Sequence, residues 1–126
     1  MSAEIKDISL ALRQAMLACP NITNLVINRI SSPAFNNEDE NPKICYRQNG
    51  GDLTYHRYAF RVRGDTIQQA KEVAMTIVNL FSAKAPELIG FNSVFGILDG
   101  NINEVYYDDE KANEVFFNIR FEFLES

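Results

Sequence analysis

The sequence has few of the residues that build metal, redox or disulfide sites. Among its 126 residues there is no tryptophan, a single histidine, His56, and only two cysteines, Cys19 and Cys45. No Cys-x-x-Cys pair is present, so we expect neither a zinc site nor a cofactor. The two cysteines fall in different predicted elements, which indicates two small buried thiols rather than a disulfide.

Long apolar runs and an excess of positive charge are also missing. No apolar run is long enough to span a bilayer, and the N-terminus lacks the basic and apolar segments of a secretory signal. We therefore expect synthesis in the cytosol and no membrane partner. The net charge of -5 argues against sequence-specific nucleic-acid binding, which uses clustered lysine and arginine to neutralise phosphates.

The clearest pattern is helical and spans residues 65–83. Apolar residues recur there at steps of three and four, as one face of an amphipathic helix requires: Ile67, Ala70, Val73, Ala74, Ile77, Leu80 and Phe81. Asp65 is expected to cap the N-terminus, with Gln68 reaching back as in a capping box. Such a helix needs a sheet or another helix to cover its apolar face.

The N-terminal third predicts a helix, a short strand and a loop. Residues 5–18 place apolar side chains on one face: Ile5, Ile8, Leu12, Ala15 and Met16. Pro20 is expected to end that helix. Residues 25–30 are rich in β-branched side chains and predict a strand, and residues 31–42 are polar and predict a loop.

The remaining segments predict strands. Residues 44–48 and 53–63 are joined by a turn at 49–52, residues 94–98 and 102–107 by a turn at 99–101, and residues 115–123 form the last strand. In 53–63 the side chains alternate between an apolar set, His56, Tyr58, Phe60 and Val62, and a second set, Tyr55, Arg57, Ala59, Arg61 and Arg63.

Together these elements predict an α+β fold in the order α-β-β-β-α-β-β-β. We expect one domain over residues 1–126, with a largely antiparallel sheet of about six strands and two helices packed on one face.

Several possible sites have simpler structural interpretations. Gly64, Asp65 and Thr66 open a helix as phosphate sites do, but capping is favoured because no nucleotide-binding glycine pattern is present. His56 has no nucleophile or carboxylate at a known spacing, so a partly buried strand histidine is favoured over a catalytic base. The acidic runs at 38–40 and 108–110 lack the spacing of a calcium loop and predict solvated loops.

For the remaining candidates, partner binding and a structural role stay equally open. Arg57, Arg61 and Arg63 form a stripe that an acidic partner could bind, although ion pairs with Glu114 and Glu122 explain it equally well. Phe116 is a large apolar group on a polar strand face, which suggests an interface or a single exposed aromatic.

The loop at 32–43 offers a second contact region. We expect it to be mobile in the free subunit, because it has two prolines and three consecutive carboxylates. Phe35 would be its apolar anchor, and Glu38, Asp39 and Glu40 would select a basic neighbour. A solvated connector is the alternative.

The order and type of these segments resemble a known family. The features are the helix at 10–17, the break at Pro20, Asn28-Arg29-Ile30, the run Asn41-Pro42-Lys43-Ile44-Cys45-Tyr46, the strand at 58–62, Gly64-Asp65-Thr66, and the aromatic strand at 117–123. They resemble the tail terminator or tail-completion proteins of long-tailed bacteriophages, which are also called minor structural or minor capsid proteins.

The resemblance implies a structural protein that is not an enzyme. Proteins of that family form rings, commonly hexamers, that cap the growing tail tube and present a surface to the head-completion proteins. For this chain it implies a homo-oligomeric ring, a tail tube protein as partner, and a place at the head-proximal end of a virion tail. The host bacterium's cytoplasm would be the site of synthesis.

Two other interpretations stay open at this point. One is a head-tail connector of the same virion, which these residues do not separate from a terminator. The other is a small cytosolic α+β ligand-binding protein or enzyme with a pocket between sheet and helices, for which His56 and Tyr58 are the best candidates.

Overall fold

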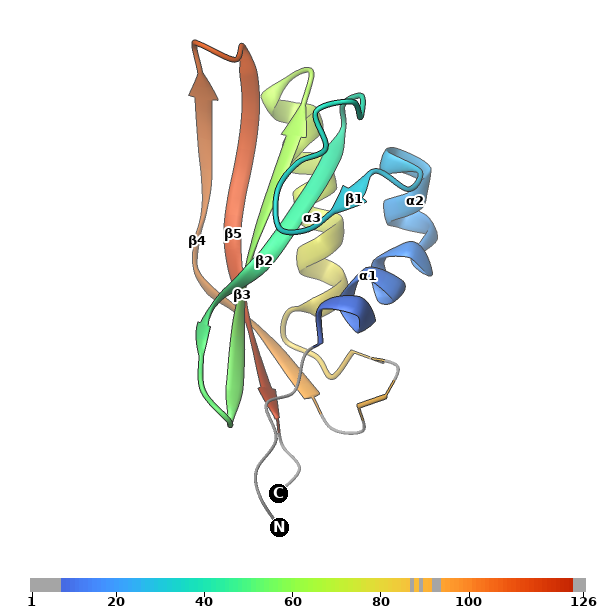
Figure 1. Ribbon diagram of the computed structural model, residues 1–126, viewed down its shortest axis with the longest axis vertical. Helices are drawn as coiled ribbons and strands as arrows, with labels where there is room; N and C mark the ends of the chain where they lie inside the picture. The colour runs from blue at the N-terminus through green and yellow to red at the C-terminus, as the bar shows by residue number, and fades with distance from the viewer. Residues whose placement is uncertain (1–7, 87, 89, 92–93, 124–126) are drawn as a thin grey trace.

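The computed structural model describes residues 8–86, 88, 90–91 and 94–123, and it confirms the α+β class (Figure 1). Within these residues three helices lie on one side of a five-stranded sheet. The helices are α1 (Ser9–Leu17), α2 (Pro20–Val26) and α3 (Ile67–Phe81). The strands are β1 (Ile30–Ser31), β2 (Lys43–Gly51), β3 (Tyr55–Gly64), β4 (Val94–Tyr107) and β5 (Ala112–Phe123).

The sheet has the strand order β1-β2-β3-β5-β4. β1 pairs with β2 in parallel, and the other neighbours pair antiparallel. On β3 the predicted alternation is confirmed, since residues 56, 58, 60, 62 and 64 are buried and the residues between them are partly exposed. The buried set faces the helices, so the arginines of β3 lie on the opposite, outer face.

The core between sheet and helices is built largely from aromatic rings. Phe60 stacks on Phe117 with ring centroids 5.6 Å apart, and Phe81 of α3 meets Phe121 edge-on at 5.4 Å. All four side chains are at most 1% exposed. Offset and edge-to-face ring pairs add to the free energy gained by burying apolar area.

The start of α3 corrects the predicted cap by one residue. Thr66 has extended backbone angles, and its Oγ1 accepts a hydrogen bond from the Gln69 N–H at 3.1 Å. The Gln69 side chain in turn accepts from the Asp65 N–H at 2.7 Å. The cap is therefore Thr66 with Gln69, whose side chain reaches back to the Asp65 N–H, and not Asp65 with Gln68.

The predicted strand at 25–30 is wrong, because residues 20–26 form helix α2. Pro20 begins this helix: its fixed φ and missing N–H suit the first helical turn. Ile22 and Val26, four residues apart, are both fully buried on one helix face. The first predicted helix is confirmed from Ser9, with Ile8, Leu12 and Met16 buried; Ile5 lies outside the described residues.

The predicted strands at 94–98 and 102–107 are one continuous strand, β4. Gly100, with φ of +91°, lies in an irregular stretch where the register with β5 shifts between Asp99 and Asn103. A glycine with positive φ suits both a tight turn and a bulge. Here β4 continues past the bulge because β5 runs unbroken beside it and pairs with both halves of β4. The described residues therefore form a sheet of five strands rather than the predicted six. Three helices cover it rather than the predicted two.

The turn between β2 and β3 also shifts, from the predicted residues 49–52 to residues 52–54. The Asp52 N–H donates to the Tyr55 carbonyl at 2.9 Å, while the Asp52 carboxylate accepts from the Thr54 N–H at 2.7 Å. Gly50 and Gly51 instead occupy an irregular end of β2 with positive φ.

Candidate functional site on the outer face of the sheet

Two of the three predicted arginines are held by a buried carboxylate on the outer face. Glu114 of β5 is 1% exposed, and its two oxygens accept from Arg61 Nε and Nη2 at 3.0 and 2.9 Å. Arg63 Nε donates to the same carboxylate at 3.0 Å, and the Tyr107 hydroxyl lies 3.4 Å from it. The hydrogen bonds between Arg61 and Glu114 raise the pKa of the Arg61 guanidinium above its ordinary value.

The cross-strand register explains this arrangement. Arg63 lies opposite Glu114 in the β3–β5 ladder, and Arg61 lies opposite Phe116. Side chains that face each other across antiparallel strands are near enough to pair, and a buried carboxylate is stable only when hydrogen bonds replace its water. The ion-pair interpretation is therefore confirmed for Glu114, and any role of these arginines in binding a partner stays a prediction.

Phe35 from the loop between β1 and β2 lies against this cluster. The Arg63 and Arg61 guanidinium carbons are 4.8 and 5.1 Å from its ring centroid, and Lys43 Nζ is 5.5 Å away. Such cation–π contacts hold the ring against the sheet of its own chain. Phe35 therefore packs against its own chain, and its predicted role as an anchor for a partner stays a prediction.

Further contacts position the rest of the loop. Lys43 Nζ donates to the carbonyls of Asn36 and Asp39 at 3.3 Å, and the Ser32 hydroxyl donates to the Tyr46 carbonyl at 2.6 Å. The side chains of Glu38 and Glu40 are exposed, and Asp39 is partly so. Loop mobility and the role of these three carboxylates in partner choice stay predictions.

Arg57 and Phe116 lie farther along the same face. Arg57 Nη1 is 3.4 Å from Asp99 Oδ2, and both side chains are 39% exposed, so this pair contributes little stability. Phe116 is 37% exposed and borders a hollow of about 250 Å³. The residues that line this hollow are Arg47, Asn49, Ala59, Arg61, Tyr107, Glu114, Phe116, Phe117 and Asn118.

The fold thus joins the predicted contact residues on one surface. Phe35, Arg61 and Arg63 form one cluster, and Phe116 lies directly across the ladder from Arg61. Arg57 lies four residues from Arg61 on the same strand face. The outer face of the sheet is consequently the candidate contact surface.

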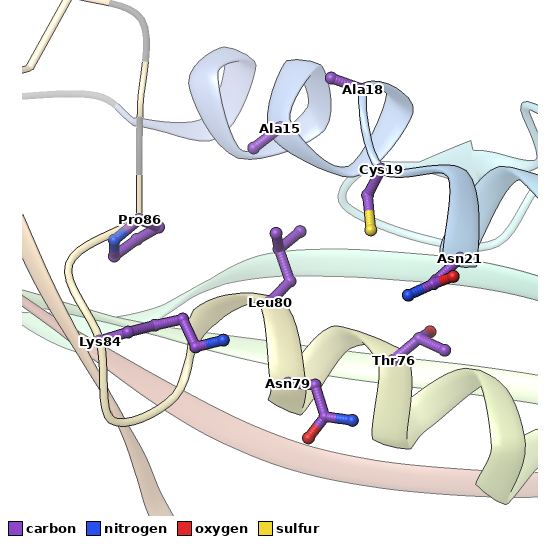
Figure 2. A pocket seen from close by; sticks show the side chains of 9 residues that line it. All are labelled: Ala15, Ala18, Cys19, Asn21, Thr76, Asn79, Leu80, Lys84 and Pro86. Atoms are coloured by element: carbon purple, nitrogen blue, oxygen red, sulfur yellow. The ribbon is translucent and has the colours of Figure 1, made fainter.

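A larger hollow that sequence reasoning missed lies between α3 and the α1–α2 pair. Figure 2 shows Leu80 rising from α3 toward the Cys19 thiol, with the Lys84 side chain extending beneath it. The hollow has a volume of about 570 Å³ and is lined by Ala15, Ala18, Cys19, Asn21, Thr76, Asn79, Leu80, Lys84 and Pro86. The sequence signal that could have indicated this hollow is the pair of small residues Ala15 and Ala18, which leave space beside α3.

This hollow has no catalytic pairing among its described lining residues. Lys84 is its only charged group, and Cys19 is the only thiol there. His56 lies elsewhere, 2% exposed, with its ring edge-on to Phe123 at a centroid distance of 4.9 Å. These surroundings favour the structural interpretation of His56 over a base.

Both cysteines are free thiols, as expected. Cys45 is buried in β2, and burial raises the pKa of its thiol to about 11, with a smaller opposing effect from Arg61. Cys19 is only partly buried, so the prediction of a buried thiol is wrong for this residue. In the described part of the chain, no three side chains of His, Cys, Asp or Glu gather as a metal site would require, and no helix there could cross a membrane.

Comparison with known proteins gives a structural match. No family model matches the chain, and no curated protein matches it. Among solved structures, a chain described as "Virion of native gene transfer agent (GTA) particle" is similar in fold, with a TM-score of 0.68. The match covers 90% of this chain and 91% of that chain at 10% sequence identity, so what the two share is the fold.

Proposed function

We propose that this chain is a structural protein of a phage or phage-like particle and acts there as a tail terminator. In this role it forms a ring, a hexamer by the family resemblance, that caps the tail tube and joins it to the head-completion proteins. The observation that carries the proposal is the near-complete overlap of its fold with a virion chain, over 90% and 91% of the two lengths.

The chemistry of the outer face agrees with a structural role. Arg61 and Arg63 are engaged with Glu114, and this surface has no nucleophile paired with a base among its described residues. A ring subunit needs contact surfaces and no bond-making chemistry. We therefore propose that the protein is not an enzyme.

The ring contact is assigned to the exposed part of this face. Phe116 supplies an apolar anchor beside a hollow, and Arg57 supplies a partly exposed charge on the same face of the sheet. Aromatic anchors next to hollows carry much of the binding free energy in protein interfaces. A head-to-tail contact of this kind joins two different patches and closes into a ring when the rotation permits.

The loop is assigned to partner choice. Glu38 and Glu40 are exposed on the loop whose Phe35 packs against the sheet, so their charges lie at the surface beside the outer face. Carboxylates at an interface rim attract a basic neighbour and disfavour an acidic one.

The test combines purified subunit with purified tail tube protein. Electron microscopy should show rings at one end of each tube, and tube growth should stop after the subunit is added. Phe116→Ala should abolish the rings, whereas Leu10→Ala, which removes an apolar side chain that is 65% exposed on α1, should not. Tubes that keep growing with no ring at their ends would refute the terminator role.

A connector role would give a different result in the same experiment. In that case the subunit binds the head-side proteins and leaves tube length unchanged. Light scattering with and without tube protein distinguishes a preformed ring from a subunit that assembles only on the tube.

A further inference from the structure

β4 is the edge strand of the sheet, and its first half is covered by the chain itself. The Gly96 N–H donates to the Lys84 carbonyl at 2.9 Å, and the Gly96 carbonyl accepts from the Ala83 N–H at 2.8 Å. The Leu98 N–H donates to the Ser82 hydroxyl at 2.9 Å. These contacts occupy the edge of β4 up to Leu98.

The second half of β4 presents an open edge. Backbone groups along an antiparallel strand point alternately to the two sides, so Gly96 faces the edge while its neighbours bond to β5. Beyond the bulge Asn103 pairs with Phe116, which leaves Glu104 and Tyr106 as the edge-facing residues. Among the described residues, neither of them makes a backbone hydrogen bond to another segment.

Apart from the Glu104 carboxylate, which pairs with Lys71, this half of the strand has none of the usual barriers to further pairing. Residues 102–107 contain no proline and no lysine, and they are rich in β-branched and aromatic residues. Sheet edges that must stay unpaired usually carry proline, lysine or a bulge. Here the bulge lies at residues 99–103, before the open stretch.

The opposite edge of the sheet is too short to serve as its mate. β1 has two residues, and the Ser32 hydroxyl covers the Tyr46 carbonyl of β2. Beyond Tyr46, β2 becomes irregular between Gln48 and Gly51. A head-to-tail continuation of the sheet from β4 to β2 would therefore gain few hydrogen bonds.

We propose that a second copy of this chain adds its own β4, antiparallel, to this open edge about a two-fold axis at Val105. In this register each Glu104 faces Tyr106 of the second copy, and the two Val105 side chains meet on the outer face. A register centred on Glu104 would oppose two carboxylates, which is unfavourable across a strand pair. The open strand is thus self-complementary in one register.

The side chains beside the open edge of β4 are suited to contact β4 of the second copy. Lys71, Met75, Ile102 and Glu104 line a hollow of about 270 Å³ between α3 and β4. Met75 and Tyr106 are 44% and 52% exposed, and Lys71 Nζ is 3.1 Å from Glu104. Tyr106 of the second copy would cover this hollow, and Lys71 would offset the charge of Glu104.

This dimer does not rest on the proposed ring. A two-fold contact uses the same patch on both copies and closes at two, whereas a ring joins two different patches. The surfaces also differ: the dimer uses the open edge of β4 and the ring uses the outer face around Phe116.

The first test is Tyr106→Pro, studied by sedimentation equilibrium over a wide concentration range. Proline removes an edge-facing N–H that the subunit itself does not use, so the fold should persist. Removing two symmetric hydrogen bonds should raise the dimer dissociation constant at least about tenfold. Gln48→Pro, at the other edge of the sheet, is the matched control and should leave dimerisation unchanged.

The second test does not depend on tolerance of proline. Val105→Cys is placed in a background with Cys19→Ala and Cys45→Ala, and the protein is oxidised mildly. Facing residues of a non-hydrogen-bonded pair have Cα atoms about 4.5 Å apart, within the range that a disulfide spans. A disulfide-linked dimer is expected from Val105→Cys and not from Leu10→Cys.

Other results would overturn the inference. A monomer at all concentrations does so, and so does a dimer that Tyr106→Pro leaves intact and Val105→Cys fails to link. Crosslinking through Glu104→Cys instead would refute the register. Because ring formation on tubes is scored separately, rings without this dimer would reject the inference and leave the proposed function standing.

Discussion

The two faces of the sheet bury their side chains in different ways. The inner face is covered by helices and filled with aromatic rings, such as Phe60 and Phe117. On the outer face no helix of the described residues covers the sheet, yet this face buries the Glu114 carboxylate beneath its own arginines. Apolar area stabilises the first face, whereas the second is stable only while every buried charge keeps its partners.

The adjacent residues Phe116 and Phe117 give the most direct comparison of the faces. Phe117→Ala should cost about 3–5 kcal/mol of unfolding free energy, because it empties a buried position stacked on Phe60. Phe116→Ala should cost less than about 1 kcal/mol, since that ring is 37% exposed. Urea denaturation measures both, and equal losses would mean that the outer face is packed as tightly as the inner one.

Removing the buried charge tests the outer face itself. Glu114→Gln should cost about 2 kcal/mol, because Arg61 and Arg63 are left close together without their shared carboxylate. The figure lies below the usual loss for a fully buried pair, since the Arg61 side chain is 35% exposed. Glu122→Gln, which removes a more exposed pair with Arg120, should change stability by less than about 1 kcal/mol.

The Phe35 ring, which lies over the Arg61, Arg63 and Glu114 cluster, should contribute less to the free energy of unfolding than the cluster itself. Phe35→Ala should cost about 1 kcal/mol, because the ring contacts Lys43, Arg61 and Arg63 through cation–π interactions at a partly exposed site. Amide hydrogen exchange in residues 32–43 should become faster in this variant. Unchanged exchange would show that the hydrogen bonds of Lys43 and Ser32, rather than the ring, hold the loop.

The smallest expected effect on stability at neutral pH comes from the ionisation of Cys45, near the same cluster, because this effect begins only above pH 9. Burial raises the pKa of its thiol from the ordinary value of 9.0 to about 11. The unfolded chain therefore loses this proton first, so stability present below pH 9 should fall between pH 9 and 11. Comparing denaturation of the native protein with Cys45→Ala over this range should show a shallower decline in the variant; identical slopes would contradict the raised pKa.

Prediction from sequence succeeded where one residue pattern admits one structure. The alternation in β3 predicted which side chains face the helices and placed all three arginines on the other face. The polar face of the last predicted strand offered Glu114 and Glu122 as ion-pair partners; Glu114 pairs with Arg61 and Arg63, whereas Glu122 pairs with Arg120. The bidentate geometry and near-complete burial of Glu114 were not predictable, since Arg61 lies 53 residues away in the chain and meets Glu114 only because β3 pairs with β5.

Prediction failed where one pattern admits two structures. Residues 25–30 are β-branched enough for a strand, but a proline at the first helical position and two buried side chains four residues apart make residues 20–26 the helix α2. Gly100 suits a tight turn and a bulge equally, and the unbroken β5 beside it selects the bulge.

The sequence by itself determined the α+β class, the apolar face of α3 and the two faces of β3, because these follow from local periodicity. Tertiary structure alone decided the strand order, the burial of Glu114 and the covering of one half of β4. Gly96 shows the physical reason, because a side chain there would lie 1.9 Å from the Phe81 carbonyl oxygen. Only contacts between distant segments determine which half of an edge strand is covered and which half stays open.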